Sequence, residues 1–200
     1  MNKRLLIILV LIMPIASPAQ KRPVPLTVSF FNESTAIPFT RFFTTPVHPG
    51  IQLGTEFNYK NKKHSRLFQT ANICYFYHNY LAQGIGLNTE LGYEYRFKFR
   101  LAFEGLLGIG YMHTFATSEE FTFSNGHYEK KADKGNARLY PSLAIGIGYY
   151  LEKNNKNSPK LFIRYQSWAE YPYSPGFISV MPHINLHLGA KFFINNKNSK

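Results

Sequence analysis

The sequence predicts an all-β fold: an eight-stranded antiparallel up-and-down transmembrane β-barrel, preceded by a cleaved signal peptide. Three observations predict it: an N-terminal segment typical of exported proteins, repeated alternation of apolar and polar residues, and connections that alternate between long and short. The 200 residues suit one domain. Aromatic residues make up 16% of the chain, which excludes a disordered protein. The single cysteine, Cys74, excludes an intramolecular disulfide framework.

The N-terminal segment has the pattern of a secretory signal peptide. Lys3 and Arg4 form its positive region, an apolar run extends to Ala16, and small residues precede an expected cleavage point. The apolar run is too short for a membrane-spanning helix, which needs about 20 residues. We therefore expect a signal peptide over residues 1–19 and an outer-membrane β-barrel domain over residues 20–200.

Period-two alternation runs along most of the remaining chain and indicates strands with two unlike faces. Between Ile85 and Tyr95, for example, apolar side chains alternate mostly with glycine, asparagine and glutamate. Seven such segments are Ile51–Tyr59, Leu67–His78, Ile85–Tyr95, Phe99–Tyr111, Leu139–Leu151, Lys160–Trp168 and Ile184–Ile194. Alternation from Leu26 to Phe31 predicts a shorter eighth strand near the start of the barrel domain.

Three features indicate that the apolar faces point outward to lipid. The polar faces are rich in glycine, which leaves room for a crowded interior. Several segments run about 9–13 residues, long enough to cross a bilayer at a tilt. Aromatic residues lie near both ends of the apolar faces, as in the girdles of membrane barrels. The expected girdle residues are Tyr59, Tyr93, Tyr95, Tyr149 and Phe192 at one interface and Tyr75, Tyr77, Tyr111 and Tyr165 at the other. A soluble barrel with its apolar face inward is the alternative.

The connections between the expected strands alternate in length. The first, fifth and seventh, Asn32–Gly50, Met112–Arg138 and Ala169–Pro182, are long, whereas the second, fourth and sixth are short. Bacterial membrane barrels have an even number of strands, long external loops and short periplasmic turns. The pattern therefore predicts that both termini are periplasmic, and it requires the shorter first strand to be real.

Taken together, these features resemble the small eight-stranded bacterial outer-membrane barrels, the group that contains the OmpA transmembrane domain, OmpX and OmpW. The resemblance covers Leu26 to Ile194 and includes a last strand that ends in Phe192 and Phe193. The usual assembly signal ends the chain at its aromatic residue, whereas Asn195–Lys200 follow here. The resemblance matches no single subfamily. It implies a bacterial cell outer membrane location, contact with membrane lipids including lipopolysaccharide, and insertion by the outer-membrane assembly machinery.

An eight-stranded barrel has an interior just wide enough for side chains to fill. Charged groups are costly on a lipid face, so the charged residues of the strands belong inside, paired with one another. The expected lumen network is Glu56, Glu90, Glu94, Arg100, Glu104, Arg164, His183, His187 and Lys191. We interpret this network as a plug that replaces a hydrophobic core. A narrow channel for small solutes is the alternative.

Two histidines in the last expected strand invite a metal interpretation. His183 and His187 share one face of the strand, but four residues at ~3.3 Å each separate them by about 13 Å. One metal ion cannot reach both side chains. We therefore expect no metal site there, and no cofactor.

An outer-membrane enzyme is the main functional alternative. Lipid A deacylases among the small barrels carry His and Ser two positions apart on one strand, and the nearest counterpart here is His183 with Asn185, which has no nucleophile. Other candidate nucleophiles without a triad-like histidine spacing are Ser142, Ser167, Ser174 and Ser179. We expect no catalytic residues and no enzymatic activity, and leave a lipid A-modifying acyl hydrolase or acyltransferase as the alternative.

The net charge of +12 is distributed over turns and loops. We interpret Lys60–Arg66 and Glu152–Lys156 as solvated caps of periplasmic turns. We expect no nucleic acid partner, because no sequence signal of a nucleic-acid-binding fold accompanies the positive charge. Charges that could meet lipopolysaccharide phosphates are Lys130, Lys131, Lys134 and Arg138 in the longest loop. We expect a monomer with a structural or surface-interaction role carried by its external loops.

Overall fold

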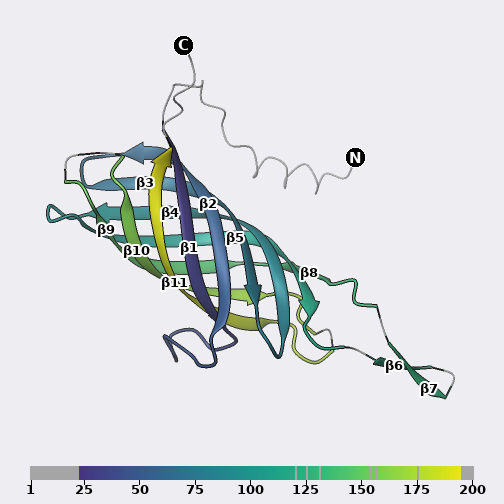
Figure 1. Ribbon diagram of the computed structural model, residues 1–200. Coiled ribbons are helices and arrows are strands. Elements are labelled where there is room, and N and C mark those ends of the chain that lie inside the picture. Colours follow the sequence, from purple (N-terminus) through teal and green to yellow (C-terminus); the bar gives the residue numbers. More distant parts are fainter. Residues whose placement is uncertain are drawn as a thin grey trace, which may run out of the picture.

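The computed structural model describes residues 23–194 except residues 120, 125, 131, 154, 156 and 175. The expected signal peptide, residues 1–19, and the C-terminal residues 195–200 lie outside this described part. Within the described part, no helix is long and apolar enough to cross a membrane. The secondary structure consists of β-strands, eight of which form the wall of a closed barrel (Figure 1).

The barrel closes by antiparallel pairing of consecutive strands and of the first strand with the last. Its strands are β1 (Val24–Ser34), β2 (His48–Asn61), β3 (Ser65–Tyr77), β4 (Ala82–Arg96), β5 (Leu101–Ala116), β9 (Ser142–Tyr150), β10 (Lys160–Glu170) and β11 (Met181–Ile194). A short strand, β8 (Asn136–Leu139), lies in line with β9 along β5, and the two keep one register. The predicted fold, an eight-stranded up-and-down transmembrane barrel, is confirmed.

The observed strands match the eight expected segments and extend several of them. The first strand, expected to be short, runs 11 residues and pairs with both β2 and β11. The loop between β1 and β2 is correspondingly shorter than expected and covers residues 35–47. A hairpin that the sequence did not predict, formed by β6 (Phe121–Ser124) and β7 (His127–Lys130), projects beyond the barrel wall (Figure 1).

The two ends of the barrel differ, and we name them by their connections. The turn end holds three connections, the start of β1 and the end of β11. The loop end lies opposite and carries the β6–β7 hairpin (Figure 1). The turn-end connections are residues 62–64, 97–100 and 151–159, and the loop-end connections are residues 35–47, 78–81, 117–135 and 171–180.

Burial alternates along the strands, and the apolar side chains lie on the outer surface. In β9 every second residue is buried. Leu143, Ile145 and Ile147 are exposed, and the residues between them, Ala144 and Gly146, are buried. Leu107 on β5 and Leu188 on β11 are each 66% exposed on the outside of the wall. The soluble-barrel alternative is therefore wrong, because it requires these side chains to point inward.

Inward-facing glycines make room for large side chains inside the narrow barrel. A Cβ atom added at Gly92 would lie 2.4 Å from the ring of Phe68, which is fully buried and packs with Leu106 and Ala144. By contrast, a Cβ atom added at Gly105, which faces outward, would meet nothing within 4 Å. Glycine at position 92 is thus explained by close packing of the lumen.

Candidate functional site

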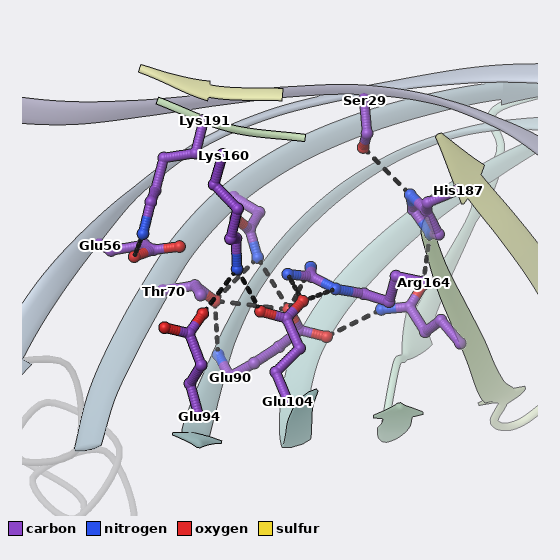
Figure 2. A network of polar contacts seen from close by, with 12 residues as sticks. Ser29, Glu56, Thr70, Glu90, Glu94, Glu104, Lys160, Arg164, His187 and Lys191 are labelled. Atoms are coloured by element: carbon purple, nitrogen blue, oxygen red, sulfur yellow. Dashed lines mark hydrogen bonds and ion pairs between the residues drawn. The ribbon is translucent and has the colours of Figure 1, made fainter. Parts of the chain in front are cut away.

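A cluster of buried ions fills the lumen near the turn end. Its members, which we call the turn-end ion cluster, are Glu56, Arg66, Glu94, Glu104, Lys160, Arg164 and Lys191. Lys160 bridges two strands, with its Nζ 2.7 Å from Glu94 Oε2 and 2.6 Å from Glu104 Oε2. Arg164 donates from Nε and Nη2 to Glu104 Oε1 at 3.0 and 2.7 Å (Figure 2).

A second part of the same cluster joins β2, β3, β4 and β11. Arg66 donates two hydrogen bonds to Glu94, from Nε to Oε1 at 2.9 Å and from Nη2 to Oε2 at 3.1 Å. Arg66 also donates to Glu56, which accepts a further bond from Lys191 Nζ at 3.2 Å. Tyr150 donates to Glu94 Oε1 at 2.5 Å. These charge-assisted and bidentate bonds hold the strands together across the lumen.

The charges of the turn-end ion cluster and Glu90, its neighbour in the middle of the lumen, balance one another. Four carboxylates, Glu56, Glu90, Glu94 and Glu104, face four cations, Arg66, Lys160, Arg164 and Lys191, all of them buried. Arg164 connects Glu90 to the turn-end ion cluster, because its Nη1 lies 3.7 Å from Glu90 Oε2. Buried charges are tolerated only when paired and hydrogen-bonded, and this arrangement meets both conditions.

Neutral polar groups surround Glu90 in the middle of the lumen. Glu90 accepts bonds from Gln166 Nε2 at 2.8 Å and from Asn72 Nδ2 at 3.3 Å. Gln166 in turn accepts from Asn185 Nδ2 at 3.0 Å. We call this region the mid-lumen polar layer, and it extends to His187 on β11 (Figure 2).

A serine and a histidine meet in the mid-lumen polar layer. Ser29 Oγ lies 3.1 Å from His187 Nδ1 (Figure 2). His187 Nε2 lies 3.3 Å from Gln166 Oε1. Ser29 and His187 are each 1% exposed, and the third partner is an amide in place of an acid. A catalytic serine needs a base oriented by a third group and an open path for substrate. His187 could serve as the base for Ser29, but burial of both side chains leaves no open path for a substrate.

An apolar layer lies between the mid-lumen polar layer and the loop end. It consists of Phe31, Cys74, Phe76, Met112, Tyr140 and Trp168. The order of the layers follows the inward positions along each strand, which on β1 are Ser29, Phe31 and then Glu33. Cys74 lies buried inside this layer, where it packs as a small residue.

Acidic and imidazole groups gather at the loop end, just beyond the apolar layer. We call this group the mouth cluster: Glu33, His48, His78, Glu170 and His183. His183 Nδ1 lies 2.7 Å from Glu33 Oε1, and the indole of Trp168 stacks on the His183 ring at 4.0 Å. The rings of His48 and His78 stack with centroids 3.5 Å apart. Burial holds the pKa of His78, in the β3–β4 loop, below its ordinary value.

Eight of the nine residues expected in the lumen lie there, and one does not. The eight are Glu56, Glu90, Glu94, Glu104, Arg164, His183, His187 and Lys191. The assignment of Arg100 to the lumen is wrong: it lies in the β4–β5 turn with φ of 75°, donates to the Leu151 carbonyl and stacks over Tyr149. A positive φ ends the alternation, so the inward parity of β5 does not extend back to Arg100.

Two lumen cations were missed by the sequence analysis. Arg66, assigned to a solvated cap, is 6% exposed and bonds to Glu56 and Glu94, so that assignment is wrong for this residue. Lys160 was not considered for the lumen, although it shares the inward parity of Phe162. Extending the Leu67–His78 segment by one residue toward the turn would have found Arg66, and reading the alternation of Lys160–Trp168 back to its first residue would have found Lys160.

The expected girdle residues point outward, with one difference. Exposed at the outer surface are Tyr59, Tyr75, Tyr77, Tyr93, Tyr95, Tyr111, Tyr149 and Phe192. Tyr165 is covered, because the rings of Phe39 and Phe42 from the 35–47 loop pack against it at 5.3 Å each. Its hydroxyl accepts from the Phe39 amide at 2.9 Å and donates to the Arg41 carbonyl at 3.3 Å.

The basic residues of the longest loop do not form one displayed patch. Arg138 turns toward the mouth cluster, where its Nε lies 2.8 Å from Glu170 Oε1, and it also donates to the Pro172 carbonyl. Lys130 pairs with Glu119. Lys134 is exposed, and Lys131 lies outside the described residues.

No protein-family model and no curated protein sequence matches the chain. Among solved structures, the outer membrane enzyme PagL aligns with a TM-score of 0.49 at 11% identity, over 84% of this chain and 98% of that one. Neisserial surface protein A aligns with a TM-score of 0.48 at 9% identity, over 84% and 94% of the two chains. Ail, the attachment invasion locus protein of Yersinia pestis, aligns with a TM-score of 0.43 at 13% identity, over 85% and 97%.

Proposed function

We propose that the chain is a bacterial outer-membrane protein whose plugged barrel anchors surface loops, and that these loops carry a structural or interaction role. The observation that carries the proposal is the charge balance of the turn-end ion cluster with Glu90, in which each of the four glutamates lies beside a buried cation. A channel needs a continuous wet path, whereas these side chains fill the lumen and the apolar layer lies across it. The barrel is therefore a closed support for its loops.

Conductance tests the plug directly. Purified protein inserted into planar lipid bilayers should give no steady open-pore current, and the heat-modifiable band of the same sample shows that the barrel is folded. Steady conductance from folded protein would replace the plug with the narrow channel that remains the alternative.

Location is tested separately. Membrane fractionation should recover the chain in the outer membrane as a heat-modifiable monomer, with a mature N-terminus at Gln20. We infer insertion by the outer-membrane assembly machinery, since a closed barrel with an apolar belt cannot remain stable in water. Recovery of a soluble periplasmic form would contradict the proposed location and the assembly route together.

The loops supply the surface through which the protein would act. Exposed aromatic residues in them include Phe42, Phe43, Phe121, Phe123 and Tyr128. The exposed Lys134 adds positive charge beside the β6–β7 hairpin, which suits contact with lipopolysaccharide. Deleting residues 121–130 should leave a folded barrel and weaken its binding to lipopolysaccharide micelles. Unchanged binding would remove the hairpin from the interaction surface.

A second candidate function, acyl transfer or hydrolysis on lipid A, is favoured by one observation, the contact between Ser29 and His187. Burial of both side chains argues against it, because a lipid acyl chain cannot reach the hydroxyl. Purified protein should release no acyl chains from lipid A. Release that disappears in both Ser29→Ala and His187→Ala variants would establish the enzyme instead.

A further inference from the structure

Three side chains of the mouth cluster come together at the loop ends of neighbouring strands. Glu33 lies near the end of β1, His48 begins β2 directly opposite it, and His78 follows the last residue of β3. One potential ligand atom from each lies within 4.8 Å of the other two. Two imidazole nitrogens and one carboxylate oxygen are a donor set that suits a borderline divalent transition ion.

Two of these ligand atoms are buried and have no hydrogen-bond partner among the described residues. Glu33 is 0% exposed, and its Oε2 has no donor, although its Oε1 is held by His183. His48 is 8% exposed, and its Nε2 is likewise without a partner. Buried polar atoms are rarely left unsatisfied, so two of them in residues whose ligand atoms lie this close together point to a group that binds both.

The hydrogen bond on the far side of His48 sets its tautomer. His48 Nδ1 lies 3.1 Å from the Glu33 backbone carbonyl, which can only accept, so Nδ1 carries the proton. Nε2 then carries the free lone pair and has no hydrogen-bond partner among the described residues. Metal-ligating histidines characteristically donate their other ring nitrogen to a carbonyl or carboxylate in this way.

Glu33 is positioned by a similar chain of contacts. His183 Nδ1 bonds its Oε1 at 2.7 Å, and Trp168 stacks on the His183 ring, which fixes that imidazole in place. On the other side of His183, Glu170 Oε2 lies 3.4 Å from Nε2, and Arg138 pairs with Glu170. The carboxylate of Glu33 therefore keeps one oxygen free for a cation.

His78 is the adjustable ligand. It is half-buried in the β3–β4 loop, and the Tyr80 amide lies 3.3 Å from its Nδ1, a long hydrogen bond that a metal could displace. Ligands of one tetrahedral Zn²⁺ lie about 3.4 Å apart, given Zn–N bonds of about 2.0–2.1 Å. The His48 and His78 rings are stacked with centroids 3.5 Å apart, so the His78 side chain must rotate out of this stack before nitrogens of both rings can point at one ion.

We propose that Glu33, His48 and His78 form a binding site for a divalent transition metal ion, of which Zn²⁺ is the type, at the loop-end mouth of the barrel. The fourth coordination position is left to water. The site would tie β1, β2 and the β3–β4 loop together beside the surface loops. It is separate from the turn-end ion cluster and does not depend on the proposed role of the loops.

The test is Zn²⁺ binding to the full mature chain, purified in detergent without a histidine tag. Competition with a chromogenic chelator should give one ion per chain. Glu33→Gln, His48→Ala and His78→Ala should each weaken binding by about 10- to 100-fold or more. The matched control is His113→Ala, a loop-end histidine that bonds to Tyr111 and to the Lys134 carbonyl outside the cluster, and it should bind as the unaltered chain does.

A second readout keeps the test independent of stability. Trp168 is the only tryptophan in the chain and contacts the cluster through His183, so bound Co²⁺ should quench its fluorescence. Heat-modifiable migration confirms that each variant is folded. Saturable quenching that is lost in the folded His78→Ala variant and kept in His113→Ala supports the site. Absence of saturable binding, or unaltered affinity in folded Glu33→Gln and His48→Ala variants, overturns it.

Discussion

Replacing Arg164 with methionine should strongly destabilise the barrel. The substitution keeps an unbranched stem but removes two bonds to Glu104 and the only cation recorded beside Glu90 in the described structure. Glu104 retains Lys160, whereas Glu90 keeps only neutral donors. The lumen would then hold an uncompensated buried charge, for which the expected cost is about 3–5 kcal/mol in unfolding free energy.

Urea unfolding in detergent or lipid vesicles, followed by the fluorescence of the single tryptophan, measures this cost. The control is Arg100→Met, which removes a guanidinium from the β4–β5 turn and should change stability by less than about 0.5 kcal/mol. Adding Glu90→Gln to Arg164→Met restores neutrality and should recover about 1–3 kcal/mol of the loss. Equal small effects of Arg164→Met and Arg100→Met would refute the reasoning, because they would mean that water already screens the lumen charges.

Three further predictions concern the wall and a loop. Arginine at Leu107, on the outer surface, should cost about 2–4 kcal/mol of folding stability in bilayers, measured by urea titration, and a neutral result would show that the facing is wrong. Gly92→Ala should cost about 1–3 kcal/mol because its Cβ meets the Phe68 ring, whereas Gly105→Ala, which meets nothing, should be neutral in the same assay. Tyr165→Phe removes the hydroxyl that bonds to Phe39 and Arg41 of the 35–47 loop, so trypsin should cut after Arg41 faster than in the unaltered chain. Equal cleavage rates would show that the Tyr165 hydroxyl does not hold the loop.

The wall of the barrel was predictable because its information is local. Alternation assigns both the strands and their faces, since one face meets lipid and the other a crowded lumen. The first strand was underestimated because Asn32, Glu33 and Ser34 are all polar, which hides the alternation at its end. Those residues extend β1 because Asn32 bonds to the Thr44 carbonyl and the His48 amide of the following loop and strand.

The mouth cluster could not be predicted in the same way. Glu33 and His48 lie on different strands and His78 lies in the β3–β4 loop, and each alone has no distinguishing context in the sequence. They meet because the register sets His48 opposite Glu33 and Phe76 opposite Gly50, which brings the end of β3 beside them. Register depends on pairings across the whole sheet, so local patterning cannot supply it.

The pairing of β1 with β11 has a consequence for folding kinetics. It joins Val24 to Ile194, so these contacts link the most distant parts of the described chain. Such non-local pairing makes folding slow, because the entropy of closing the long loop is lost before the contacts that compensate for it are made. Several lumen interactions cross this seam, including Lys191 with Glu56 and His183 with Glu33. A partly zipped barrel would therefore carry unpaired charges at both open edges, which favours closure of the whole cylinder in a single cooperative step.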